Sequence, residues 1–222
     1  MHLYIAYKNY SSWSLRPWIA MKVAGIPFDE TVLTFDHNDG LDKLAERLDI
    51  PAQVPVLHDE NNVIWDSLAI MEYLAETYPN RQLWPENKGL RAMARSTSNE
   101  MHSGFMDLRK VCPMNCRNQK RLSAKNRAAI QNDLDRLVAL WAKFDGVDKP
   151  DGDFLCGQFG IVDAMYAPVM WRVLGYGLEV SPAFEKWASA MQALPEMQEW
   201  LTAAQQESWV IEATENCAED VV

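Results

Sequence analysis

The sequence lacks several features that define whole classes of protein. It has no run of ~18 consecutive apolar residues, so no helix is expected to span a membrane. The first ten residues carry neither a basic segment nor a long apolar run, so no signal peptide is expected. Four cysteines in 222 residues are too few for a disulfide scaffold, and the reducing cytoplasm is the simplest compartment.

Positive charge is also scarce. The chain has 21 Lys and Arg against 31 Asp and Glu, which gives a formal net charge of −10. Such a protein repels phosphate backbones, so nucleic acid is not an expected partner. Cys112 and Cys116 lack the second cysteine pair or well-placed histidine that a zinc site needs, and no metal is expected. Nine tryptophans and eleven methionines suggest instead a generous core or a large apolar cleft.

The first 78 residues follow an α/β pattern. Leu15, Ile19 and Val23 repeat every four residues behind the helix-capping Ser11 and Ser12. The predicted order is β-α-β-α-β-β-α, a thioredoxin-like domain at 1–78. Its strands are expected at 2–7, 28–35, 54–58 and 62–65, and its helices after Ser11, within 37–49 and after Asp66.

Beyond residue 78 the strand pattern disappears. We predict a linker at 79–87 and an all-α domain at 88–222, with a loose acidic tail after Glu212. The segment 161–174 is apolar nearly all round, so that helix is expected at the centre of the second domain. The other helices are expected at 86–111, 124–145, 182–193 and 195–207.

A serine-rich segment opens the first helix, from Ser11 to Pro17. Unpaired N–H groups and the positive end of the helix dipole favour an anion at this point. A serine hydroxyl here can donate to a thiolate and lower the pKa of the thiol from its usual ~8.5. The alternative is that these serines simply cap the helix, since serine is among the commonest capping residues.

The second motif is Gln53-Val54-Pro55-Val56. Proline removes a hydrogen-bond donor from a strand, so Pro55 indicates a strand start, an edge or a cis bond. A cis bond would leave the backbone N–H and C=O of Val54 free to pair with an extended peptide ligand. The alternative is a proline that only begins a strand.

The third motif is Trp65-Asp66-Ser67, where a strand runs directly into a helix. Ser67 at the helix N-terminus can bind a carboxylate, and Asp66 can bind an ammonium group beside it. Together they suit the α-amino acid end of a small peptide. The alternative is again a capped helix.

In this order and spacing, the three motifs resemble those of the glutathione transferase superfamily, and the SSWS segment at Ser11 is similar to the zeta-class SSCS pattern. The resemblance covers nearly the whole chain. It implies a thioredoxin-like domain with a cis-proline, a helical second domain and, commonly, a homodimer. It also implies glutathione as co-substrate, a small electrophile as the second substrate, and a role in detoxification. By this resemblance Ser11 activates the thiol and Ser12 is able to substitute; the expected glutathione-binding residues are Gln53, Val54, Pro55, Asp66 and Ser67.

The second domain offers weaker candidates for an electrophile pocket. Pro113 is expected to interrupt a helix and present the next two residues to the cleft. Arg109 could neutralise a carboxylate of glutathione or substrate. Trp13 stands where zeta enzymes have cysteine, which changes the pocket wall. The predicted pocket residues are Trp13, His102, Arg109, Met114 and Asn115.

Three functions are compatible with these residues. The first is a glutathione S-transferase, whose bound thiolate attacks a small electrophile. The second is a glutathione-dependent cis-trans isomerase of a dicarboxylate such as maleylacetoacetate, for which Arg16 and Arg109 are the available cations. The third is a non-catalytic binding protein with the same fold. A disulfide reductase is disfavoured, since no cysteine occupies position 11.

Overall fold

A computed structural model describes residues 1–34 and 40–220, with a small mixed sheet in its N-terminal part. The strands are β1 (His2–Ile5), β2 (Asp29–Val32), β3 (Val56–Asp59) and β4 (Asn62–Trp65), in the spatial order β2-β1-β3-β4. β2 is parallel to β1, whereas β3 is antiparallel to both β1 and β4. The predicted thioredoxin-like order is confirmed, although β1 and β2 are shorter than expected; residue 35 of the expected second strand lies outside the described residues.

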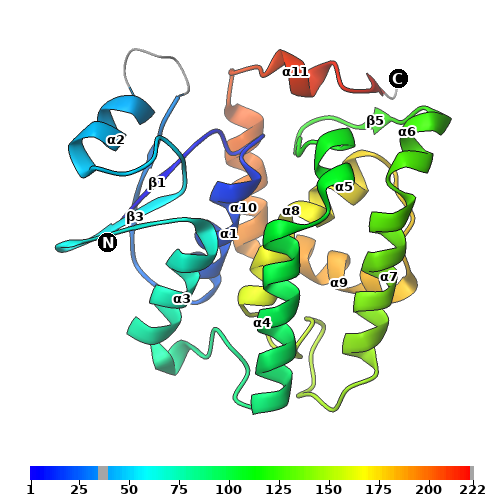
Figure 1. The fold of residues 1–222 in the computed structure, drawn as a ribbon, viewed down its shortest axis with the longest axis horizontal. Coiled ribbons are helices and arrows are strands. Elements are labelled where there is room, and N and C mark those ends of the chain that lie inside the picture. The colour runs from blue at the N-terminus through cyan, green and yellow to red at the C-terminus, as the bar shows by residue number, and fades with distance from the viewer. Residues whose placement is uncertain (35–39, 221–222) are drawn as a thin grey trace.

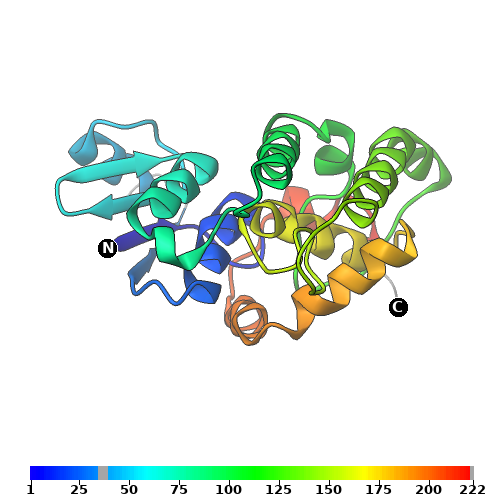
Figure 2. The same cartoon turned by 90° about the horizontal axis from the view of Figure 1, so that it is seen from below.

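The sheet packs with three helices, α1 (Ser12–Val23), α2 (Leu41–Leu48) and α3 (Ser67–Thr77). Every residue of α1 from Ser14 to Met21 is buried. This burial arises because α1 lies against α3 and the sheet on one side and against α8 of the second half on the other (Figure 2). A helix covered on both sides needs no polar stripe, which explains its apolar sequence.

The C-terminal half is helical, and α8 is its buried centre, as predicted (Figure 1). A short 3-10 turn, η1 (Pro79–Arg81), lies in the predicted linker. The helices are α4 (Lys88–Ser103), α5 (Met106–Val111), α6 (Ala124–Ala129), α7 (Gln131–Asp145), α8 (Ile161–Gly175), α9 (Pro182–Ala193) and α10 (Pro195–Gln206).

Two of the predicted helices are interrupted. The segment expected at 86–111 divides into α4 and α5 because Gly104 ends α4 and Phe105 has a positive φ of 57°. A side chain at position 104 would approach the carbonyl oxygen of Glu100 to 2.8 Å, so glycine is needed there. The segment expected at 124–145 divides at Ile130, where the backbone leaves helical values.

The expectation of a loose C-terminal tail was wrong. The tail forms the short helix α11 (Glu212–Glu215) and the strand β6 (Glu219–Asp220), which pairs with β5 (Lys120–Arg121). In Figure 1 this segment crosses the top of the molecule. The order arises from polar contacts at Glu215, which accepts a hydrogen bond from Asn118 and lies 3.4 Å from the ammonium of Lys120.

A buried aspartate fixes the start of α8. Asp163 Oδ2 accepts from the amide of Gly160 at 3.0 Å, which is the half of a capping box that the sequence retains. Its Oδ1 accepts from the amide of Leu155 at 2.9 Å and from Trp187 Nε1 at 2.8 Å. Burial raises the pKa of Asp163 to about 6 despite these three hydrogen bonds. Asp163 is therefore structural.

We predict that Asp163→Ala lowers the free energy of unfolding by about 3 kcal/mol or more. Three buried donors would lose their acceptor, and each orphaned group costs about 1–3 kcal/mol. Denaturant unfolding measures the effect, with Asp153→Ala as the control, because Asp153 is exposed and, within residues 1–34 and 40–220, pairs only with Lys186. Equal stability of the two variants would contradict the assigned role.

Candidate functional site

The three N-terminal motifs meet at one pocket of about 360 Å³. The pocket lies where the start of α3 and the residues before β3 face the C-terminal end of α4. Seven of the residues predicted from sequence line it: Trp13, Gln53, Val54, Pro55, Asp66, Ser67 and His102.

The backbone before β3 is available to a ligand. The Val54–Pro55 peptide bond is cis, and Pro55 is buried. Because β3 begins only at Val56, Val54 lies outside the ladder. Within residues 1–34 and 40–220, neither its N–H nor its C=O has a hydrogen-bond partner. These two groups can pair with the backbone of an extended peptide.

The start of α3 carries a second polar group without a partner. Ser67 is fully buried, and its hydroxyl makes no hydrogen bond to any part of the chain that the structure describes. An unpaired buried hydroxyl is costly, and here it lines a pocket at the N-terminus of an 11-residue helix. A carboxylate placed there would satisfy both the hydroxyl and the helix dipole.

Asp66 is held in place from two domains. It caps α3 with a positive φ of 76°, and its Oδ1 accepts from the amides of Leu68 at 2.9 Å and Ala69 at 3.2 Å. Its Oδ2 lies 3.3 Å from His102 Nε2 on α4. The carboxylate is therefore oriented by backbone and histidine, with lone pairs left for an ammonium group.

Trp13 forms a wall of the pocket and contacts two guanidinium groups. The Cζ atoms of Arg16 and Arg109 lie 4.2 and 4.9 Å from the ring centroid of Trp13. The ring also meets the edge of His102, with centroids 5.2 Å apart. These cation–π contacts fix the indole and place positive charge behind the pocket wall.

The two arginines have other structural contacts. Arg109 donates to the carbonyls of Met101 and His102 and so caps the end of α4, and it does not line the pocket. Arg16 is buried, and its Nε donates to the carbonyl of Met165 at 3.1 Å. Burial, with Arg109 and Arg172 nearby, lowers the pKa of Arg16. Asp66 opposes this lowering, so the positive charge of Arg16 is only partly compensated and favours an anion in the adjacent space.

Ser11 and Ser12 lie at the start of α1 but do not line the pocket. Ser11 caps the helix, since its Oγ accepts from the amide of Ser14 at 3.4 Å. Its hydroxyl also donates to Ser14 Oγ at 2.7 Å, and Ser14 Oγ accepts from the amide of Ala6 at 3.1 Å. The hydroxyl of Ser12 has no partner among the described residues. Ser14, which accepts a hydrogen bond from the Ser11 hydroxyl, was not predicted as a site residue from the sequence.

The structure does not bring Met114 and Asn115 to this pocket. Met114 is buried in the core, and Asn115 Nδ2 donates to both carboxylate oxygens of Glu215 at 3.0 Å. Pro113 does follow the end of α5, but the chain then turns inward. The expectation that these two side chains face the cleft was wrong because Met114 packs in the core and Asn115 bonds to the C-terminal segment.

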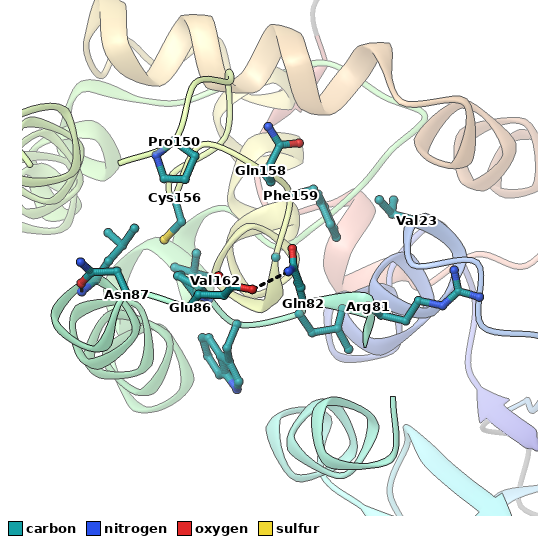
Figure 3. A pocket seen from close by; sticks show the side chains of 15 residues that line it. Val23, Arg81, Gln82, Glu86, Asn87, Pro150, Cys156, Gln158, Phe159 and Val162 are labelled. Atoms are coloured by element: carbon teal, nitrogen blue, oxygen red, sulfur yellow. Dashed lines mark hydrogen bonds between the residues drawn. The ribbon is translucent and has the colours of Figure 1, made fainter. Parts of the chain in front are cut away.

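A larger pocket of about 590 Å³ lies at the linker, away from these residues (Figure 3). Gln82 and Glu86 in its wall bond to each other at 2.7 Å, and Arg81 reaches the carbonyl of Gly25 at 3.4 Å. Its polar groups therefore do not converge on a common ligand position. None of the residues predicted from sequence lines it.

Metal ligands, membrane-spanning helices and reactive thiols each depend on a recognisable arrangement of residues. Among residues 1–34 and 40–220, no three His, Cys, Asp or Glu side chains come together as metal ligands, and no helix is long and apolar enough to cross a membrane. Burial raises the pKa of Cys112 and of Cys156 to about 12, so both remain protonated thiols near neutral pH. A cysteine nucleophile at either position is disfavoured.

Comparison with known proteins agrees with both halves of the fold. A model of the N-terminal domain of glutathione S-transferases matches residues 10–77, and a model of their C-terminal domain matches residues 119–203.

Individual relatives are distant but cover most of the chain. A probable maleylacetoacetate isomerase of Caenorhabditis elegans is 28% identical over 181 residues, which cover 81% of this chain and 82% of the relative. A bacterial zeta-class maleyl pyruvate isomerase structure has a TM-score of 0.71 at 21% identity, covering 94% of this chain and all of that one. A glutathione transferase homologue from Burkholderia gl BGR1, with bound glutathione, has a TM-score of 0.68 at 21% identity and covers 93% and 98%.

We predict that Asp66→Ala lowers the free energy of unfolding by about 1 kcal/mol, the usual cost of losing an N-cap. Asp66→Asn should cost less, because its side-chain oxygen can still accept from Leu68 and Ala69. Thermal unfolding of the two variants measures the difference. Equal losses would contradict capping by the side-chain oxygen.

Proposed function

Because the chain belongs to the glutathione S-transferase superfamily, we propose that it is an enzyme that binds glutathione and activates its thiol for attack on a small electrophile. One observation carries the proposal: the buried, unpartnered hydroxyl of Ser67 lines a pocket beside the fixed carboxylate of Asp66. This pair matches the carboxylate and ammonium of a γ-glutamyl group.

In the proposed complex the glutathione backbone extends along the residues before β3. The γ-glutamyl carboxylate accepts from Ser67 at the N-terminus of α3, and the ammonium donates to Asp66. The cysteinyl N–H and C=O pair with the free backbone groups of Val54. Pro55 and Gln53 complete this side of the pocket.

Ser11 is the proposed thiol-activating residue. Its hydroxyl proton now points to Ser14 Oγ, but hydroxyl groups rotate. When Ser11 donates to a thiolate, the Ser14 hydroxyl can donate to Ser11 in return, so the number of hydrogen bonds between the two serines is conserved. The amide of Ala6 holds Ser14 in place for this exchange. Ionisation releases the thiol proton to solvent, and the thiolate then forms a C–S bond with the electrophilic carbon. In a substitution the leaving group departs with the electron pair of its bond to that carbon; in an addition to a double bond the neighbouring carbon takes a proton from solvent.

A second candidate is the glutathione-dependent cis-trans isomerisation of a dicarboxylate. The curated relative named as a probable maleylacetoacetate isomerase favours it, as does the positive charge of Arg16 and Arg109. Both guanidinium groups, however, lie against Trp13 and donate to backbone carbonyls. Because a transferase needs no cations for two carboxylates, we rank the transferase function above the isomerase function. A panel of electrophiles that includes maleylacetone discriminates the two, since an isomerase converts maleylacetone in the presence of glutathione.

The remaining parts of the proposal follow from family membership. We infer a homodimer that acts in the cytoplasm in detoxification, with a glutathione-binding domain at 1–78, a linker at 79–87 and a substrate-binding domain at 88–222. Retention on immobilised glutathione, with turnover of an electrophile, separates this enzyme from a non-catalytic protein of the same fold.

We predict that the wild-type protein binds free glutathione and that Ser11→Ala raises the pKa of the bound thiol by about 1–2 units. A hydrogen bond to a charged group contributes about 1.5–3 kcal/mol, and one pKa unit corresponds to about 1.4 kcal/mol. The absorbance of the thiolate as a function of pH measures this value, with Ser12→Ala as the matched variant that should leave it unchanged. Failure to bind glutathione would overturn the function, whereas an unchanged pKa in Ser11→Ala would remove Ser11 alone from this role.

A further inference from the structure

The loop that presents Ser11 is short and held mainly from outside its own domain. Residues 7–11 form a turn, in which the amides of Tyr10 and Ser11 donate to the carbonyl of Tyr7 at 3.1 and 2.8 Å. Within the N-terminal half, Lys8 pairs with Glu30 and Ser11 donates to Ser14. Further hydrogen bonds come from two segments distant in the sequence, residues 115–118 and residues 207–215.

Glu207, at the end of α10, binds two successive amides of the loop. Its Oε1 accepts from the amide of Lys8 at 2.6 Å, and its Oε2 accepts from the amide of Asn9 at 3.0 Å. Hydrogen bonds to a carboxylate are stronger than those between neutral groups. One side chain therefore fixes the direction of the backbone just before Tyr10.

Asn9 connects the same loop to the segment after α5. It is fully buried, and its Oδ1 accepts from the amides of Cys116 at 2.9 Å and Arg117 at 3.1 Å. Its own carbonyl accepts from the amide of Cys116 at 3.3 Å. The loop is thus attached on both sides.

Glu215 of α11 completes the attachment at the residue next to Ser11. Its Oε1 accepts from the hydroxyl of Tyr10 at 2.5 Å, and that hydroxyl in turn accepts from Arg117 at 2.7 Å. Asn115, Asn118 and Lys120 hold the same carboxylate from the other side. Burial, followed by the bond to Glu215, raises the pKa of Tyr10. The phenol therefore stays a donor at neutral pH.

The Glu215 carboxylate can be removed without leaving a cavity in the hydrophobic core, because no residue of α11 is buried. The segment is held by hydrogen bonds, ion pairs and the contact of Trp209 with Tyr7, whose ring centroids lie 5.1 Å apart, and Cys217 and Ala218 beyond α11 pack against the core. Loss of the Glu215 carboxylate should therefore loosen the loop at Tyr10, while Glu207 and Asn9 keep their hydrogen bonds and the sheet and the buried helices stay folded.

We propose that Glu215 is a positioning residue that, through Tyr10, holds the Ser11 hydroxyl in place for the thiol. This inference rests on the proposed function, since it matters for catalysis only if Ser11 activates glutathione. A displacement of about 1 Å at a reacting group can cost about a hundredfold in rate, so a loop freed by a few tenths of that distance should lose about tenfold.

The test compares Glu215→Ala with Glu212→Ala in the full-length protein. Glu212 belongs to the same helix, and its side chain is exposed and makes no contact within the described residues. Glu215→Ala should lower kcat about tenfold and raise the pKa of bound glutathione towards the ~8.5 of a free thiol, with less than a twofold change in glutathione Kd. Glu215→Gln keeps an acceptor for Tyr10 and should recover part of kcat, whereas Glu212→Ala should match the wild type.

A second readout does not depend on glutathione. Hydrogen exchange of the amides of residues 7–12 should accelerate in Glu215→Ala and in Tyr10→Phe, while the protected amides of α8 stay unchanged. Unaltered exchange in this loop would overturn the inference, as would an unaltered thiol pKa and kcat in Glu215→Ala. If the wild-type protein binds no glutathione while Glu215→Ala still shows the accelerated exchange, the proposed function is overturned and the attachment of the loop by Glu215 is established.

Discussion

The burial of α1 between the sheet and α8 is the constraint on which the rest of the structure depends. Since this helix is covered on both sides, its direction is fixed by both halves of the chain at once. Its N-terminus, with Ser11 and Trp13, therefore has a defined position relative to the start of α3 and the end of α4. The pocket is lined by residues of the N-terminal half and by His102 of α4. A helix that packs against both halves is therefore needed to hold these residues in fixed positions relative to one another.

The site itself joins the two halves through polar contacts of modest strength. His102 of α4 contacts Asp66 of α3, and the indole of Trp13 lies among His102, Arg16 and Arg109. Membership of the glutathione S-transferase family suggests that this pocket binds a ligand. The Ser67 hydroxyl and the Val54 backbone, which have no hydrogen-bond partner within residues 1–34 and 40–220, indicate where that ligand would bind. Preorganised donors of this kind need little rearrangement when a ligand arrives.

Local signals explain why much of the fold and of the pocket could be predicted from sequence. The proline at Pro55 and the strand-to-helix step at Asp66 are short motifs whose backbone consequences are contained within a few residues. The burial of α8 followed likewise from an uninterrupted apolar sequence. The breaks at Gly104 and Ile130 were missed because each is a change in the backbone angles of one or two residues, which hydrophobic periodicity does not report.

Long-range polar pairing accounts for the rest of what the sequence did not reveal. Glu215 lies 205 positions from Tyr10 and 100 from Asn115, and no pattern along the chain relates an acidic residue in a tail to a tyrosine near the start. An acidic tail by itself suggests solvation, and a proline before Asn115 suggests that this side chain faces the cleft. Both expectations fail for the same reason, because Asn115 and Glu215 bond to each other. The loop bearing Ser11 is attached to the same C-terminal segment through Tyr10 and Glu215. The hydroxyls of Ser11 and Ser14 can therefore exchange hydrogen bonds with each other, while the carboxylate of Glu215, bonded to Tyr10, fixes where Ser11 lies. This long-range contact is visible only in the folded chain.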